Sequence, residues 1–168
     1  MRKAFAGILI FTFSILVFAN LKIFLFSRFP HKWEYLIIGL IYGFFAFAVL
    51  GGWQKISRVL KWILAFIGAH SFISVILNLI LIPKFSGAYL PFSLQIILRK
   101  IKLLIHLPSQ IYLSRVFGTL GEAADVTVLM NAVHPLIKAL LDVAYAGIIA
   151  MIAYEIYKKI PRKTQKSR

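Results

Sequence analysis

The chain has 168 residues, of which 61% are hydrophobic and 15% are charged, whereas soluble domains average about 45–50% apolar and about 25% charged residues. A single soluble core of this size has no room for so much apolar surface. We therefore expect an integral, multi-pass membrane protein of the all-α class, a polytopic transmembrane helix bundle. The absence of cysteine excludes disulfides, thiolate nucleophiles and cysteine-ligated metal sites.

Four apolar runs are long enough to cross a bilayer as helices, which requires about 20 mainly apolar residues. Trp33 and Trp53 border the second run, as interfacial aromatic residues do, and Pro83 ends the third. We predict spans over about 4–26, 34–53, 59–82 and 136–157, all within one transmembrane domain of residues 1–160.

The region 84–135 contains no simple span. Residues 94–107 place basic side chains on one helical stripe and aliphatic ones on the rest, which is typical of a helix in the membrane interface. Pro108 ends this helix. A helix packed on partner spans, a re-entrant segment and a fifth span are the alternatives, the last disfavoured because Arg115 and two acids would face lipid.

Cations outnumber acids by twenty to five, giving a formal net charge of +15. Six of the cations fall in the last eleven residues. We therefore expect the protein to lie in the cell membrane, with residues 161–168 as a basic tail in the cytoplasm. The bilayer, with its anionic lipids, is the expected partner, and we do not expect nucleic-acid binding, because the cations form no single patch. The cations expected to contact anionic lipid are Arg99, Lys100, Lys102, Lys158, Lys159, Arg162 and Lys163.

Small residues recur at four-residue spacing in three of the predicted spans. Close approach of backbones at such positions holds membrane helices together. The pattern indicates either packing within this bundle or docking on other membrane subunits, including a second copy of the chain. The residues are Gly39, Gly43, Ala65, Ala69, Ala146 and Ala150.

Polar side chains follow one face of the third span and the start of the fourth. Neutral groups in such places bond across helices, and ionisable ones are candidates for function. Lys138 and Asp142 are four residues apart and can pair on one helix face. We interpret the set as interhelical contacts or as a polar pathway. Its members are His70, Ser71, Ser74, Asn78, Lys138 and Asp142.

The sequence contains no recognisable motif for metal binding or catalysis. The four histidines are scattered, with no HxxxH or HExxH spacing, so we expect no metal, no cofactor and no catalytic residue. Nothing in the sequence supports a nucleophile–base pair such as Ser71 or Ser74 with His134.

Three functions follow as hypotheses. The first is a non-catalytic subunit or accessory factor of a larger membrane complex, which the packing motifs favour. The second is a transporter or channel that uses the polar stripe of the third span. The third is an enzyme that modifies lipid head groups, in which cations such as Arg99, Lys102 and Arg115 hold phosphate.

Overall fold

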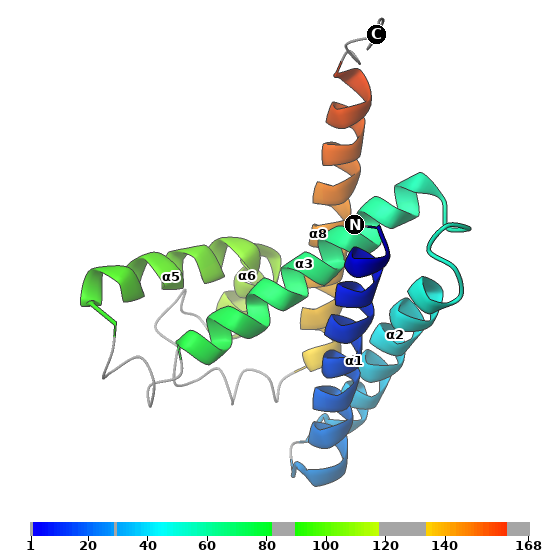
Figure 1. The fold of residues 1–168 in the computed structure, drawn as a ribbon. Coiled ribbons are helices and arrows are strands. Elements are labelled where there is room, and N and C mark those ends of the chain that lie inside the picture. Colours follow the sequence, from blue (N-terminus) through cyan, green and yellow to red (C-terminus); the bar gives the residue numbers. More distant parts are fainter. Residues whose placement is uncertain (1, 29, 82–89, 118–133, 161–168) are drawn as a thin grey trace, which may run out of the picture.

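The computed structural model describes residues 2–28, 30–81, 90–117 and 134–160. These residues form helices and connecting turns, with no strand among them, which confirms the all-α prediction. The helices, shown in Figure 1, are α1 (Arg2–Phe26), α2 (Lys32–Leu50), α3 (Arg58–Ile80), α5 (Phe92–Ile105), α6 (Leu107–Phe117) and α8 (Pro135–Lys159).

Four of these helices, α1, α2, α3 and α8, are long and apolar enough to cross a membrane. They correspond to the four predicted spans, with small shifts at the ends. The second helix ends at Leu50 instead of 53, because Gly51 closes it and Gly52 adopts a left-handed φ of 136° that glycine tolerates. Trp53 therefore lies in the turn after α2, outside the helix.

Local signals account for the remaining helix boundaries. The hydroxyl of Ser57 accepts a hydrogen bond from the backbone N–H of Leu60 at 3.3 Å and caps the start of α3. Pro135 occupies the first turn of α8, where its missing N–H costs no helical bond. A single residue, His106, separates α5 from α6, and Pro108 lies in the first turn of α6. The predicted helix over 94–107 therefore ends two residues earlier, at Ile105, and Pro108 lies inside the following helix instead of ending one.

The core lies between α1, α2, α3 and α8. Phe13 is fully buried, and it packs with Leu9 and with Leu64 of α3. Gly68 faces Leu9 so closely that a Cβ there would overlap its side chain. The short helices α5 and α6 lie beside this bundle (Figure 1), α5 against α3 and α6 against α8.

The helix α5 has the predicted basic amphipathic character and no buried residue. Arg99 and Lys100 are exposed and Lys102 is half-buried. With 14 residues, α5 is too short to cross a membrane, so the described residues contain four candidate spans. Lys158 and Lys159 are exposed at the end of α8, while Arg162 and Lys163 lie outside the described residues.

One end of the bundle brings together the start of α2 and the start of α8. The backbone N–H of Leu136 donates to a carboxylate oxygen of Glu34 at 2.8 Å. The helix α8 then runs away from this end, so that the last described residues lie at the opposite end (Figure 1). We call the first end the His31 end, after His31, Glu34 and His134.

Candidate functional site

All four histidines, scattered in the sequence, are paired in the structure, and each pair shares a carboxylate. His70 and His106 meet Asp142 inside the bundle, and we call these three with Ser74 the buried cluster. His31 and His134 meet Glu34 at the His31 end, and we call these three the surface cluster. Neither grouping is evident from the sequence, because the members of each cluster are 32 or more residues apart, except for His70 with Ser74 and His31 with Glu34.

The imidazole of His106 is the centre of the buried cluster. Its Nδ1 lies 2.8 Å from Oδ2 of Asp142, and its Nε2 lies 2.7 Å from Oγ of Ser74. Both His106 and Asp142 are nearly buried, at 5% and 7% exposure. The two ring nitrogens therefore connect a hydroxyl on one helix with a carboxylate on another.

The chemistry of the partners fixes which atoms donate. An ionised carboxylate only accepts hydrogen bonds, so Nδ1 of His106 carries a proton and donates it to Asp142. In the neutral imidazole, Nε2 is then an acceptor, and the Ser74 hydroxyl donates to it. This order of groups, hydroxyl, imidazole and carboxylate, is the arrangement that activates a serine nucleophile in serine hydrolases.

The corner between α5 and α6 holds His106 in place. Nε2 of His70 donates to the carbonyl of Ile105 at 3.0 Å, and the hydroxyl of the fully buried Ser109 donates to the carbonyl of His106 at 3.0 Å. The rings of His70 and His106 are edge to face, with centroids 5.1 Å apart. The backbone on either side of His106 is therefore bonded, and its ring orientation is set by the fold.

A cationic side chain lies beside the carboxylate of the buried cluster. Nζ of Lys138 lies 3.9 Å from Oδ2 of Asp142, so the predicted pair on one face of α8 is present. Burial is the main cause that lowers the pKa of Lys102 on α5, with the charges of Lys138 and Arg99 adding to it. The charges of Lys138 and Arg99 therefore disfavour the charged form of Lys102, and an anion near these cations would be favoured.

The predicted polar stripe on α3 divides in the structure. His70 and Ser74 join the buried cluster. Ser71 is buried and hydrogen-bonds Tyr42 of α2 instead. Asn78 is exposed and takes no part in the cluster. Ser74 has His106 as its partner, in place of the His134 considered from the sequence.

The predicted packing residues lie mainly inside the bundle. Gly39 and Gly43 face Val17 and Asn20 of α1, at distances that place a hypothetical Cβ in ordinary contact. Ala146 and Ala150 are buried on α8, which packs on α3. Ala65 is half-buried and Ala69 is exposed. Packing within the bundle therefore accounts for most of these residues.

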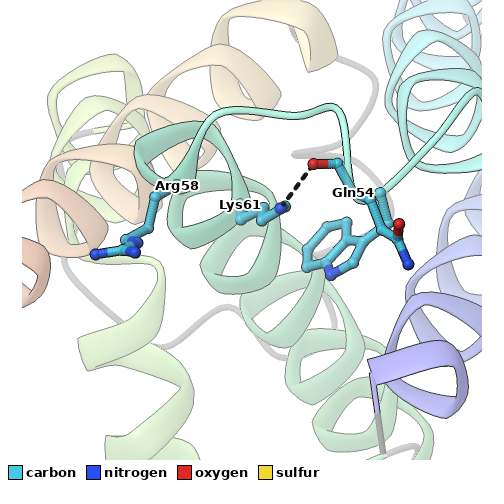
Figure 2. Close-up of a pocket in the computed structure, with 4 residues that line it drawn as sticks. Gln54, Arg58 and Lys61 are labelled. Atoms are coloured by element: carbon cyan, nitrogen blue, oxygen red, sulfur yellow. Dashed lines mark hydrogen bonds between the residues drawn. The ribbon is translucent and has the colours of Figure 1, made fainter.

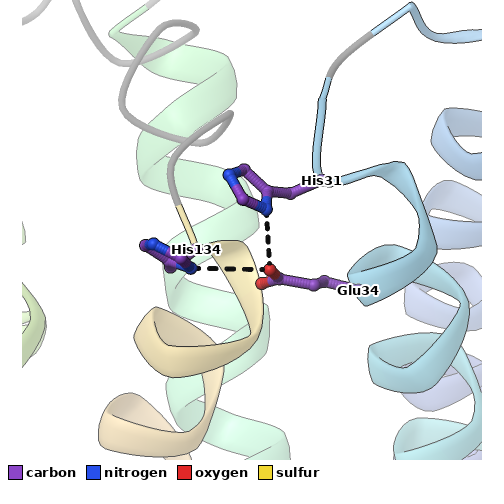
Figure 3. A group of neighbouring side chains, drawn as sticks. All are labelled: His31, Glu34 and His134. Atoms are coloured by element: carbon purple, nitrogen blue, oxygen red, sulfur yellow. Dashed lines mark ion pairs between the residues drawn. The ribbon is translucent and has the colours of Figure 1, made fainter.

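The surface cluster is shown in Figure 3. Oε1 of Glu34 lies 3.0 Å from Nδ1 of His31 and 3.6 Å from Nδ1 of His134. The two imidazole rings have centroids 4.6 Å apart. His134 has a left-handed backbone, with φ 47°, the only non-glycine residue of the described part with a positive φ.

An open pocket of about 490 Å³ lies in the connection between α2 and α3, lined by Trp53, Gln54, Arg58 and Lys61 (Figure 2). Nζ of Lys61 donates to the carbonyl of Gln54 at 3.4 Å and lies 5.9 Å from the centre of the Trp53 ring. The pocket contains no histidine or carboxylate, and its lysine already has partners. It is therefore a weaker candidate for chemistry than either cluster.

No protein-family model, curated protein or solved structure matches the chain.

Proposed function

We propose that the protein is a membrane-embedded serine acyl hydrolase that acts on anionic lipids. The observation that carries this proposal is the position of His106, whose two nitrogens contact Ser74 and Asp142 at 2.7 and 2.8 Å. Both distances are within the range of about 2.6–3.2 Å for a nucleophile and its base. The sequence favours a non-catalytic subunit because its potential catalytic residues are far apart along the chain. The contacts of His106 weigh against that reasoning, because they bring three such residues together.

The residues perform the reaction as follows. Ser74 Oγ attacks the ester carbonyl carbon while its proton passes to Nε2 of His106, and Asp142 stabilises the resulting imidazolium. The ester C–O bond then breaks, and His106 returns the proton to the leaving alcohol. Water hydrolyses the acyl–Ser74 ester in the same manner, with His106 again as the base, and releases the fatty acid. Ser74 is the nucleophile, His106 the general base and Asp142 the positioning residue.

The depth of the site fits an ester bond of a lipid. Asp142 lies seven residues after Pro135, about 10 Å along α8, and Ser74 lies six residues before the end of α3, about 9 Å from it. The hydrocarbon core is about 30 Å thick and is flanked by polar regions that bring the total to about 40–45 Å. A group two helical turns below a helix end is therefore near the level at which acyl chains join the head group.

In this proposal, the cations near Asp142 make the protein prefer anionic over zwitterionic phospholipids. Lys138 lies 3.9 Å from the carboxylate of Asp142, and the charges of Lys138 and Arg99 both act on Lys102 of α5. Lysine and arginine hold phosphate groups by charge-assisted hydrogen bonds. A phospholipid with a net negative charge would relieve the repulsion among these cations. A zwitterionic phospholipid would relieve it less, because its head group also carries a positive charge.

Orientation is part of the same proposal. The basic residues Lys158 and Lys159 at the end of α8 favour a cytoplasmic C-terminus. Since α8 begins at the His31 end, the buried cluster then lies in the leaflet away from the cytoplasm. Labelling of a single cysteine introduced after Lys159 from either side of sealed vesicles measures this orientation.

The competing interpretation of the buried cluster is interhelical hydrogen bonding alone, and reactivity separates the two. The purified full-length protein, in nonionic detergent with added anionic phospholipid, is treated with a fluorophosphonate probe that reacts only with an activated serine. We expect covalent labelling of the wild type and none of Ser74→Ala. Ser71→Ala is the matched control, because Ser71 is a buried serine one turn away that contacts Tyr42 and not His106.

Fatty-acid release from vesicles completes the test. We expect release from phosphatidylglycerol vesicles by the wild type and by Ser71→Ala, and a loss of about 10⁴-fold or more in Ser74→Ala. Circular dichroism on each variant verifies that the helices are intact. Equal labelling of wild type and Ser74→Ala, or an unlabelled wild type that is folded, contradicts the proposal.

The subunit and the transporter hypotheses remain predictions, as does modification of lipid head groups. Docking on a larger complex loses part of its basis, because Gly39, Gly43, Ala146 and Ala150 are used within the bundle. A transport path along α3 loses Asn78, which does not join the other polar residues. Neither function has an observation in its favour as specific as the contacts of His106.

A further inference from the structure

The surface cluster has no role in the proposed hydrolysis, yet it gathers three side chains of the kinds that bind transition metals. We propose that His31, Glu34 and His134 bind a divalent cation of the zinc class, and that this ion ties the start of α8 to the start of α2. Two imidazoles and one carboxylate are a common zinc ligand set, with water in the fourth position. The three donor atoms lie within 4.8 Å of one another.

The spacing of the donors fits a tetrahedral ion. Bonds of about 2.0–2.2 Å in a tetrahedron separate neighbouring ligand atoms by about 3.4 Å. The separations from Glu34 Oε1 to the Nδ1 atoms of His31 and His134 are 3.0 and 3.6 Å, and they lie on either side of this value. Small rotations of the side chains therefore suffice to seat the ion.

The second oxygen of Glu34 supports the same interpretation. Oε2 accepts the backbone N–H of Leu136 at 2.8 Å, which fixes the carboxylate and leaves Oε1 directed at both imidazoles (Figure 3). Metal-binding carboxylates are usually held by a second hydrogen bond of this kind. The contact also joins residues 102 positions apart in the chain, so an ion here would brace the tertiary structure.

The backbone of His134 is a separate observation. Its left-handed conformation is costly for a residue with a Cβ and persists only where the surroundings enforce it. In this position the imidazole faces Glu34 and His31 immediately before α8 begins. Strained residues of this kind concentrate at ligand sites.

Access distinguishes this cluster from the buried one, which contains the same residue types. The side chains of His31 and His134 are 34% and 47% exposed, so an ion can enter from water and keep a water ligand. In the buried cluster, both nitrogens of His106 and Nε2 of His70 already have partners, and Lys138 lies 3.9 Å from the carboxylate. A dication there would have to displace them and meet a like charge.

The test uses the full-length protein in nonionic detergent, stripped of metal with a chelator and then dialysed. Co²⁺ is added, its visible absorption reports four-coordinate binding, and Zn²⁺ is used to displace it. We expect one equivalent to bind to the wild type. Binding should weaken at least about 10-fold in His31→Ala and in His134→Asn, because losing a ligand costs at least as much as losing its supporting contact.

The choice of variants keeps the result interpretable. Asparagine tolerates the left-handed backbone at position 134, so His134→Asn removes the ligand without adding backbone strain. His70→Ala is the matched control, since it removes a histidine from the buried cluster and should keep the full equivalent. Circular dichroism again verifies folding of each variant.

A second readout measures the proposed bracing. Zn²⁺ should raise the melting temperature of the wild type and of His70→Ala, and should leave that of His134→Asn unchanged. Three results would overturn the proposal: no binding by the wild type, equal binding by His31→Ala and the wild type, or binding that is lost in His70→Ala and kept in His134→Asn. Because this assay does not involve Ser74, it is independent of the hydrolase proposal.

Discussion

The buried cluster and the surface cluster contain the same kinds of side chains in different surroundings. Each has two histidines and one carboxylate, and each includes a residue at or near the start of α8, His134 in one and Asp142 in the other. In the buried cluster both ring nitrogens of His106 already have protein hydrogen-bond partners. In the surface cluster, two imidazoles converge on one oxygen and remain open to water.

The difference shows that residue types alone do not define a site. A histidine held by a hydroxyl and a carboxylate, away from water, is arranged for proton transfer. Two partly exposed histidines that share one carboxylate oxygen are arranged for a cation. Burial and the number of free donor atoms decide between these roles, and both are properties of the fold.

The largest effect should come from the carboxylates, exchanged one at a time for their amides. Asp142→Asn removes the acceptor that keeps His106 in its working tautomer, so we expect fatty-acid release to fall by about 10⁴-fold. Glu34→Gln makes the same chemical change in the surface cluster and should leave release within about two-fold of the wild type without added metal. Comparable losses in both variants would show that the clusters are not separate in function.

The next effect is on stability. His106→Ala leaves Asp142 and Ser74 without their buried partner, and an unpaired buried charge is costly. Lys138 remains nearby and offsets part of this, so we expect the free energy of unfolding to fall by about 2 kcal/mol. His134→Asn, in metal-free protein, should cost less than about 1 kcal/mol because the contact it removes is partly exposed.

Reversible unfolding in mixed detergent micelles, followed by circular dichroism, measures both values. A loss for His134→Asn that equals the loss for His106→Ala would remove the distinction between a buried and an open cluster. A stabilised His106→Ala variant would indicate that the buried contacts serve chemistry at the expense of stability.

The smallest effect concerns pH and the cations beside the buried cluster. Burial, Lys138 and Arg99 together lower the pKa of Lys102, so its ammonium loses its charge at a lower pH than an ordinary lysine. The preference for anionic over zwitterionic vesicles should therefore decline as pH rises toward the usual lysine range. Lys102→Arg stays charged throughout and should keep the preference, a difference of a few-fold at high pH.

Vesicle co-sedimentation and fatty-acid release, each measured from neutral to alkaline pH, test this prediction. Lys100→Arg on the exposed face of α5 is the control and should follow the wild type. A parallel pH profile for wild type and Lys102→Arg would contradict the assignment of Lys102 to head-group binding.

Some of the buried cluster was within reach of sequence reasoning. The helical spacing of His70 and Ser74 placed both on one face of α3, and the four-residue spacing predicted the pairing of Lys138 with Asp142, found at 3.9 Å. His106 lies within residues 94–107, where the pattern predicts an interfacial helix and gives no sign of a contact with α3 or α8. Helical periodicity specifies which face a residue occupies and carries no information on which helix packs against that face.

The sequence alone determined the all-helical class of the protein and its candidate spans. Length, apolar content and the positions of tryptophan, proline and glycine specify helices that are long and apolar enough to cross a bilayer, because each helix forms its own backbone hydrogen bonds. Only the tertiary structure decided which polar residues meet. Ser74, His106 and Asp142 are separated by 32 and 36 positions, and Glu34 and Leu136 by 102. Such contacts depend on how the helices pack, which is a property of the whole bundle.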